Sequence, residues 1–234
     1  MNIKKAIVLA GGQGTRISSV THGSSKEMLN VGGLPVIEHS IRELIEAGCT
    51  DIGVIINEKK TDLKDYLEKR KNVKILYTNN PNLFVSIVEA IKTFVGRNPF
   101  VMVFPDMLYL GQPNATQMCL EAFEKYNKSV LCLFEESKEF GKGKKYIEIE
   151  NVEGNIYSIK GLNGSSEKKI RVFTRYIFSE EIFDSLDELD SGDSEVPLLS
   201  KLIENNSLLG VFLDEDIYDA GIPEGYDKLI EKFK

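Results

Sequence analysis

Two cations follow a glycine-rich turn near the start of the chain. Gly11, Gly12 and Gly14 come directly after a short apolar run, and Arg16 and Lys26 follow them. Glycines let the backbone bend sharply and turn successive N–H groups toward one point, an arrangement that binds phosphate oxygens. An Arg grips two phosphate oxygens with its planar guanidinium, whereas a Lys is a mobile point charge that can follow a phosphoryl group through a reaction. These residue types in this order predict a site for a phosphate chain.

Two familiar phosphate-binding motifs do not fit this turn. A P-loop needs Lys followed by Ser or Thr after its last glycine, but Thr15 and Arg16 follow Gly14. The dinucleotide fingerprint G-x-G-x-x-G fails at Ile17, and Asn57 stands where an acidic residue would hold the ribose. The sequence therefore disfavours both kinds of site, and a tight turn with two solvated cations stays as the plain alternative.

The elements that must position these residues alternate between strand and helix. Short apolar runs typical of strands occupy residues 6–10, 52–56, 73–77, 100–104 and 130–134. Apolar residues recur at helical spacing between them, over residues 35–48, 61–69, 83–94 and 115–123. This rhythm predicts an α/β fold with a Rossmann-like, mixed but mostly parallel sheet flanked by helices.

The pattern of apolar and polar residues changes after residue 140. Strand patterns separated by Gly and Asn turns predict a small antiparallel substrate subregion made of residues 146–150, 155–160 and 171–178. Two helices are expected near residues 180–186 and 195–204, followed by a strand at 208–213 and a helix that begins at Pro223. We expect one domain, because no linker-like segment divides the chain.

Composition excludes several classes of protein. The net charge of -7 and the sequence pI near 5.1 argue against a nucleic-acid partner, whose footprint would be a basic face. No apolar run approaches the ~18 residues that a membrane helix needs, so no membrane partner is expected. Cys49, Cys119 and Cys132 lie in apolar surroundings without ligand spacing, which predicts buried free thiols and a cytoplasmic location.

Residues 11–16 read GGQGTR, and residues 26–29 read KEML. Together they resemble the G-G-x-G-T-R and K-x-M-L signatures of the sugar-1-phosphate nucleotidyltransferases, the nucleotide-sugar pyrophosphorylases, most closely the glucose-1-phosphate thymidylyltransferase type. Ser19, Glu27 and Asn30 stand where this family usually has prolines. The resemblance implies a single nucleotidyltransferase domain over residues 1–234, with a nucleotide-binding part at 1–135 and an acceptor-binding, metal-completing part at 136–234. Members of the family often associate into homo-oligomers.

The resemblance also implies the reaction. A sugar-1-phosphate would attack the α-phosphorus of a nucleoside triphosphate in line, and pyrophosphate would leave. Arg16 would hold the leaving phosphates and Lys26 would stabilise charge at the α-phosphate, while the backbone from Ala10 through Gly11, Gly12 and Gly14 to Thr15 would cradle the nucleotide. The attacking phosphate oxygen is already ionised at neutral pH, so this chemistry requires no general base.

Two carboxylates are candidates for holding a metal ion. Asp106 follows the apolar run at residues 100–104, at the carboxyl end of a strand, where open α/β sheets place their ligands. The resemblance implies that Asp106 is one metal ligand and that Asp219, in the segment DAGIPE similar to the family's D-x-G-x-P-E, is the other. The implied ion is Mg²⁺, which usually binds one or two carboxylates together with substrate phosphates. The plain alternatives are a turn aspartate and a loop residue before a helix.

Further residues are candidates for the acceptor and the base. Lys160 aligns with the lysine of the family's E-K-P segment, and Glu195 occupies the place of an acidic residue that meets sugar hydroxyls. A solvated strand-end lysine and a helix N-terminal acid are the alternatives. Asn82 and Ser86 resemble the N-x-x-x-S-L pattern of cytidylyltransferases that act on small phosphates.

Three functions therefore remain open at this point. The first is transfer of a nucleotide from dTTP or UTP to a sugar-1-phosphate, which gives a nucleotide-sugar. The second is a cytidylyltransferase for phosphocholine or another small phosphate. The third is a non-catalytic protein that binds nucleotide-sugars, although pure binding would not require both candidate metal carboxylates, Asp106 and Asp219.

Overall fold

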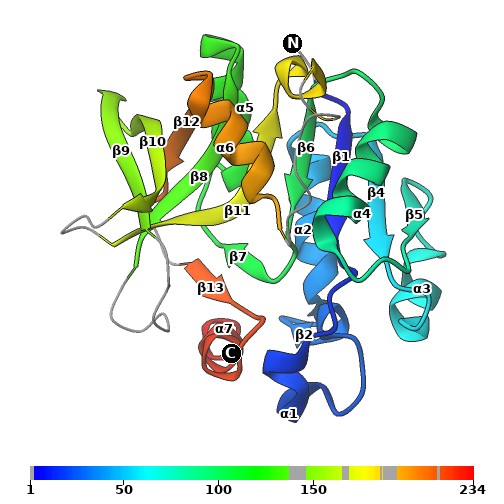
Figure 1. Cartoon of the computed structure of the whole chain (residues 1–234). Helices are drawn as coiled ribbons and strands as arrows, with labels where there is room; N and C mark the ends of the chain where they lie inside the picture. Colours follow the sequence, from blue (N-terminus) through cyan, green and yellow to red (C-terminus); the bar gives the residue numbers. More distant parts are fainter. Residues whose placement is uncertain (1–2, 137–145, 165–168, 185, 187–193, 215–216) are drawn as a thin grey trace.

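A nine-stranded mixed sheet forms the centre of this protein in a computed structural model, which describes residues 3–136, 146–164, 169–184, 186, 194–214 and 217–234 (Figure 1). In spatial order its strands are β5 (Val73–Tyr77), β4 (Asp51–Ile56), β1 (Lys5–Leu9), β6 (Phe100–Val103), β11 (Ile170–Phe178), β8 (Ser129–Glu135), β12 (Leu208–Phe212), β10 (Ile156–Gly164) and β9 (Tyr146–Glu153). The first four strands run parallel, and β12 runs parallel to β8. The predicted α/β fold with a flanked, mixed sheet is confirmed.

Helices cover both faces of the sheet. One face packs against α2 (Val36–Glu46), α3 (Thr61–Leu67) and α5 (Ala115–Tyr126), and the other against α4 (Leu83–Ala90) and α6 (Val196–Glu204). In β1, Ala6 and Val8 join the first core while Ile7 and Leu9 join the second, so the strand is buried on both sides. This explains its unbroken apolar run. Within the described residues, none of the helices combines the length and apolar character needed to cross a bilayer.

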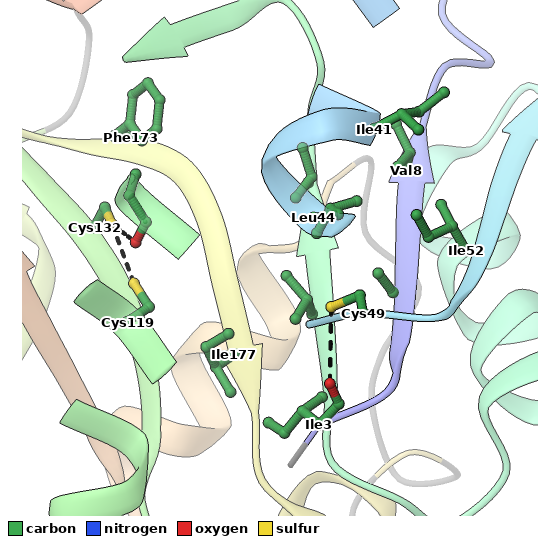
Figure 2. Close-up of a cluster of buried hydrophobic side chains, with 14 of the residues drawn as sticks. Ile3, Val8, Ile41, Leu44, Cys49, Ile52, Cys119, Cys132, Phe173 and Ile177 are labelled. Carbon is green, nitrogen blue, oxygen red and sulfur yellow. Dashed lines mark hydrogen bonds between the residues drawn. The ribbon is translucent and has the colours of Figure 1, made fainter. Parts of the chain in front are cut away.

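The core on the α2 side contains all three cysteines (Figure 2). Cys49, Cys119 and Cys132 are buried free thiols, as the sequence predicts. Burial raises the pKa of the Cys49 thiol to about 12, so this side chain stays protonated at neutral pH and is a poor nucleophile. The cysteines therefore contribute to packing.

A small antiparallel ribbon lies in the lower half of the molecule in Figure 1, above α7. It pairs β7 (Met107–Tyr109) with β13 (Ile217–Asp219), and α7 (Pro223–Lys232) follows it. A third core holds this ribbon against the segment after the glycine turn; its buried members are Ile17, Val31, Val36, Leu108, Ala220, Tyr226 and Leu229. The Tyr226 hydroxyl donates to the Asn30 carbonyl at 2.9 Å. The segment after the glycine turn thus packs against the C-terminal helix α7.

Three details differ from the predictions. Strand β11 does not pair with β9 or β10 in a small antiparallel subregion, because it lies in the middle of the main sheet between β6 and β8. The helix expected near residues 180–186 is a short 3₁₀ segment, Glu180–Asp184, and residue 185 lies outside the described residues. The β7–β13 ribbon was not predicted, since each of its strands has only 3 residues.

Candidate active site

The glycine turn continues directly from β1. The Ala10 N–H donates to the Ile55 carbonyl at 2.9 Å, which extends the pairing of β1 with β4 by one residue. Gly14 adopts the left-handed region at φ 67°, where a side chain would be strained. A Cβ at Gly14 would lie 3.5 Å from the Lys26 stem. The turn therefore packs on the methylene groups of Lys26.

Lys26 reaches from this turn to the first candidate metal carboxylate. Its Nζ atom lies 2.5 Å from Asp106 Oδ2, and both side chains are largely but not fully buried. Lys26 belongs to the 3₁₀ turn η2 (Lys26–Met28), whereas Asp106 follows β6 at its carboxyl end. The structure thus joins the cation and the acid that the sequence singles out separately.

The β7–β13 ribbon brings Asp219 beside Asp106. Asp219 pairs in register with Met107, and the Ala220 N–H donates to the Asp106 carbonyl at 2.7 Å. A Cβ built on Gly221 would lie 2.9 Å from Asp106 Oδ2, 2.9 Å from Asp219 Oδ1 and 3.4 Å from Arg16 Nη2. Two acids and a cation therefore converge on one point. Only glycine leaves room there for all three groups.

Partial burial and neighbouring charges both act on the second carboxylate, that of Asp219. Burial raises the pKa of Asp219 and the neighbouring Asp106 charge adds to the rise, while the Gly221 N–H, Arg16 and Lys26 oppose it. Two adjacent carboxylates that repel each other are a favourable setting for a cation. Among the described residues, no group of three or more His, Cys, Asp or Glu side chains could hold a metal ion alone. The pair suits an ion such as Mg²⁺, which takes further ligands from substrate phosphates.

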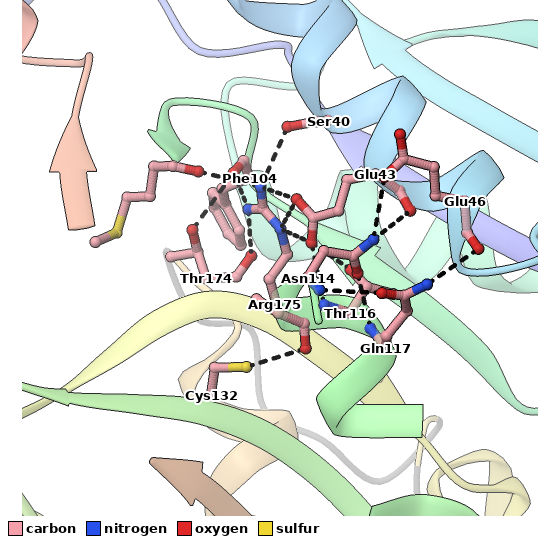
Figure 3. A network of polar contacts seen from close by, with 12 residues as sticks. Ser40, Glu43, Glu46, Phe104, Asn114, Thr116, Gln117, Cys132, Thr174 and Arg175 are labelled. Carbon is pink, nitrogen blue, oxygen red and sulfur yellow. Dashed lines mark hydrogen bonds and ion pairs between the residues drawn. The ribbon is translucent and has the colours of Figure 1, made fainter. Parts of the chain in front are cut away.

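A buried arginine fixes the backbone on both sides of Asp106. Arg175, on β11, donates to the Phe104 carbonyl at 2.9 Å and to the Met107 carbonyl at 3.1 Å. Its charge is balanced by Glu43 of α2 at 2.8 Å, and only 1% of the arginine side chain is exposed (Figure 3). Bonds to carbonyls at both ends restrict how residues 104–107 can move. Arg175 therefore anchors the segment that presents Asp106.

A pocket of about 330 Å³ opens beside the two carboxylates. Arg16, Asp106 and Asp219 line one part of it. Its remaining polar lining includes Arg171, Thr174 and Glu195, and its apolar lining is Phe104, Met107, Ile147, Leu162, Val172, Val196 and Leu199, with Tyr176 between. The pocket is large enough for a small phosphorylated molecule next to the acids.

Of the two residues predicted to bind the acceptor, one lines the pocket and the other does not. Glu195 lines the pocket and accepts a hydrogen bond from the buried Tyr176 hydroxyl at 2.9 Å. Lys160 does not line the pocket; its ammonium pairs with Glu150 at 3.0 Å, and 41% of its side chain is exposed. Sequence reasoning missed Arg171, which lines the pocket and pairs with Glu136 at 2.9 Å. The available signal was a pair of arginines, Arg171 and Arg175, in a mostly apolar strand.

Asn82 and Ser86, the candidates for contacting the base, form hydrogen bonds within the protein. Asn82 caps α4, because its side-chain oxygen accepts from the Val85 N–H at 3.1 Å. Ser86 is buried, and its hydroxyl lies 2.7 Å from that of Thr78. The Thr78 methyl group lies 3.5 Å from where a Gly11 Cβ would stand. These residues therefore support the wall beside the glycine turn, with both polar side chains already bonded inside the protein.

The protein is thus an α/β protein in which the glycine turn, the cations Arg16 and Lys26 and the acids Asp106 and Asp219 lie together. The family model described as nucleotidyl transferase matches residues 5–232, and this chain belongs to that family. A curated relative from Bacillus subtilis (strain 168), 30% identical over 97% of this chain and 96% of its own length, carries the provisional name UTP–glucose-1-phosphate uridylyltransferase. A relative from Staphylococcus haemolyticus (strain JCSC1435), which carries this name without the qualifier, is 26% identical over 97% of this chain and 90% of its own length.

Solved structures agree on the fold. A UDP-glucose pyrophosphorylase complexed with UDP-glucose has a TM-score of 0.85 at 23% identity, covering 99% of this chain and 98% of that chain. A UTP-bound enzyme of the same kind from Acinetobacter baumannii has a TM-score of 0.82 at 18% identity, covering 99% and 93%. At these identities the likeness supports the fold alone.

Proposed function

We propose that this protein transfers a nucleotide from UTP or dTTP to a sugar-1-phosphate, which yields a nucleotide-sugar and pyrophosphate. The observation that carries the proposal is the convergence of Arg16, Asp106 and Asp219 on Gly221, with Lys26 bonded to Asp106. UTP is favoured by the names of the curated relatives. A cytoplasmic location is consistent with the free cysteines.

Each group at the site has a distinct role in this reaction. Arg16 would bind the β- and γ-phosphates that leave as pyrophosphate, because its guanidinium offers a planar pair of donors. Lys26 would stabilise the charge that develops at the α-phosphate, and the N–H groups of residues 11–15 would orient the nucleotide. Asp106 and Asp219 would hold Mg²⁺, which when bound supplies charge neutralisation between the triphosphate and the anionic acceptor.

The cytidylyltransferase alternative is not favoured. It depended on Asn82 and Ser86 as base-contacting residues, but Asn82 caps α4 and the Ser86 hydroxyl is bonded to Thr78. The relatives are also named for UTP and glucose-1-phosphate. Base and acceptor are therefore both better matched by a sugar-1-phosphate enzyme.

Pyrophosphate release tests the proposed function directly. The purified protein with Mg²⁺ would be assayed with UTP, dTTP, CTP and ATP against several sugar-1-phosphates and phosphocholine. We expect release with UTP or dTTP and a sugar-1-phosphate. Release only with CTP and phosphocholine would support the alternative enzyme, and no release with any pair would favour a protein that binds without turnover.

Arg171 is our candidate for the cation that binds the acceptor phosphate. Both cations are in ion pairs, Arg171 with Glu136 and Lys160 with Glu150, but only Arg171 lines the pocket. Arg171→Met should raise the KM for the sugar-1-phosphate about 10- to 100-fold, which matches the loss of a charged hydrogen bond. The kcat and the KM for the nucleotide should change little.

Lys160→Met is the matched control for Arg171→Met, because both replace a long cation with an uncharged chain of similar length. Initial rates at varied acceptor concentration would give the KM of each variant. If Lys160→Met raises the acceptor KM and Arg171→Met does not, Lys160 binds the acceptor phosphate instead.

A further inference from the structure

Lys60, the last residue of the loop between β4 and α3, and Asp62, in the first turn of α3, bond to the two sequence neighbours of Lys26. The Ser25 N–H donates to Asp62 Oδ2 at 2.8 Å, and the Ser25 hydroxyl donates to Asp62 Oδ1 at 2.6 Å. Lys60 Nζ donates to Glu27 Oε2 at 2.7 Å. The residues before and after Lys26 are therefore fixed by side chains only two positions apart in a different part of the chain.

The same loop also holds the start of the glycine turn. Lys60 Nζ makes a second bond, to the Ala10 carbonyl at 2.7 Å. One ammonium thus connects the end of β1, where the turn begins, to the 3₁₀ turn that carries Lys26. Only 11% of the Lys60 side chain is exposed, so these bonds have little competition from water.

The buried Glu27–Lys60 ion pair is expected to add little net stability to the fold. The Glu27 side chain is fully buried, and burial raises the pKa of its carboxyl although Lys60 and Lys26 oppose the rise. Its second oxygen has no hydrogen-bond partner among the described residues. Removal of two charges from water costs about as much as their attraction returns, so such a pair is weak support for stability. A pair like this is better explained by the geometry that it imposes.

We propose that Lys60 and Asp62 are positioning residues for the nucleotidyl transfer, which set the place of the Lys26 ammonium relative to the glycine turn and Asp106. This inference rests on the proposed function. A lysine side chain has four rotatable carbons and no fixed direction of its own, so its backbone must be held firmly. An error of about 1 Å in the position of a catalytic group can cost roughly 100-fold in rate.

Kinetics of Lys60→Met and Asp62→Ala test the proposal. Both variants should lose about 10- to 100-fold in kcat, with little change in KM for either substrate, because the binding groups stay in place and only the alignment of Lys26 is lost. Lys59→Met and Asp65→Ala are matched controls, since both residues are exposed neighbours on the same segment, and they should keep wild-type kcat. Wild-type kcat in Lys60→Met and Asp62→Ala would overturn the proposal.

A second pair of variants separates positioning from stability. Lys60→Met leaves the Glu27 charge buried without its partner, whereas the double variant Glu27→Leu/Lys60→Met removes both charges and should recover the melting temperature. The double variant should keep the low kcat, because the bond to the Ala10 carbonyl is still absent. Lys60→Arg, which keeps a cation at this position, should have a kcat between those of Lys60→Met and the wild-type protein. Recovery of kcat together with melting temperature in the double variant would mean that Lys60 acts only on stability.

A measurement without substrate keeps this inference separate from the proposed function. In protein labelled with ¹⁵N-lysine, the Nζ resonance of Lys26 can be assigned by its loss in Lys26→Arg. We expect this resonance to move toward that of exposed lysines in Lys60→Met and in Asp62→Ala, but not in Lys59→Met. An unmoved resonance would overturn the positioning role. Absence of pyrophosphate release from the wild-type protein would instead overturn the proposed function.

Discussion

Asp219→Asn is expected to reduce pyrophosphate release by about 1,000-fold or more while leaving the fold intact. Asn keeps an oxygen that can accept from the Gly221 N–H, which donates to Asp219 Oδ1 at 2.8 Å. It removes the negative charge that would bind Mg²⁺ beside Asp106. Partial burial raises the pKa of Asp219, and the charge of Asp106 adds to the rise. Removal of the Asp219 charge therefore also relieves an unfavourable interaction in the free protein. The melting temperature should therefore stay the same or rise.

Asp227→Asn is the control for this prediction, because Asp227 is an exposed acid on α7, a short distance further along the chain. Steady-state rates and thermal melting of the wild-type protein and both variants would be compared. Undiminished turnover in Asp219→Asn would remove Asp219 from the metal site. A low rate accompanied by a large fall in melting temperature would mean that Asp219 has a structural role.

Arg175→Met should lower the free energy of unfolding by about 3–5 kcal/mol, the usual cost of breaking a buried ion pair by removing one partner. The substitution removes the cation that balances the charge of Glu43 and the guanidinium donor to the Phe104 and Met107 carbonyls. The loss of both anchors should also disturb Asp106, so we expect lower activity even where the variant is folded. Denaturant unfolding gives the free energy, and activity would be measured well below the melting temperature.

Arg97→Met provides the comparison for Arg175→Met. Arg97 pairs with Asp184, and about 70% of each side chain is exposed, so its loss should cost no more than about 1 kcal/mol. The double variant Arg175→Met/Glu43→Leu should recover part of the stability, because no buried charge remains. If Arg175→Met were no more destabilising than Arg97→Met, the network in Figure 3 would not anchor the Asp106 segment.

Local features of the sequence were enough to predict the central part of the fold. Strand β1 is an unbroken apolar run because helices cover both its faces, and the glycines after it mark a turn that needs a left-handed residue at Gly14. Asp106 was predicted from its position after an apolar strand. Such signals depend on residues near one another in the chain, which sequence patterns report well.

Contacts between distant segments explain what the sequence did not predict. The β7–β13 ribbon joins strands of 3 residues each, which are too short to show a period of two. Arg175 and Glu43 looked like ordinary polar residues, because the pattern of neither segment shows that the two charges meet in the interior. The Lys60 and Asp62 contacts with the signature loop are hidden for the same reason.

Lys160 and Arg171 show a further limit of prediction from the sequence. Lys160 was placed by alignment with a family segment in which only the lysine matched. The pairing of β10 with β9 shifts register between Ile159 and Gly161, so the direction of side chains around Lys160 cannot be counted from a simple alternation. Arg171 is presented to the pocket by a different strand, β11, which the sequence analysis placed in the same small antiparallel subregion as the strand of Lys160.

Metal binding in the presence of nucleotide tests the central claim most directly. Crystals of the protein grown with Mn²⁺ and a non-hydrolysable UTP analogue would be measured at a wavelength where manganese scatters anomalously. We expect an anomalous peak between the carboxylates of Asp106 and Asp219, with the phosphates between this ion and Arg16. A nucleotide bound with its phosphates elsewhere, or a peak remote from both acids, would contradict the account.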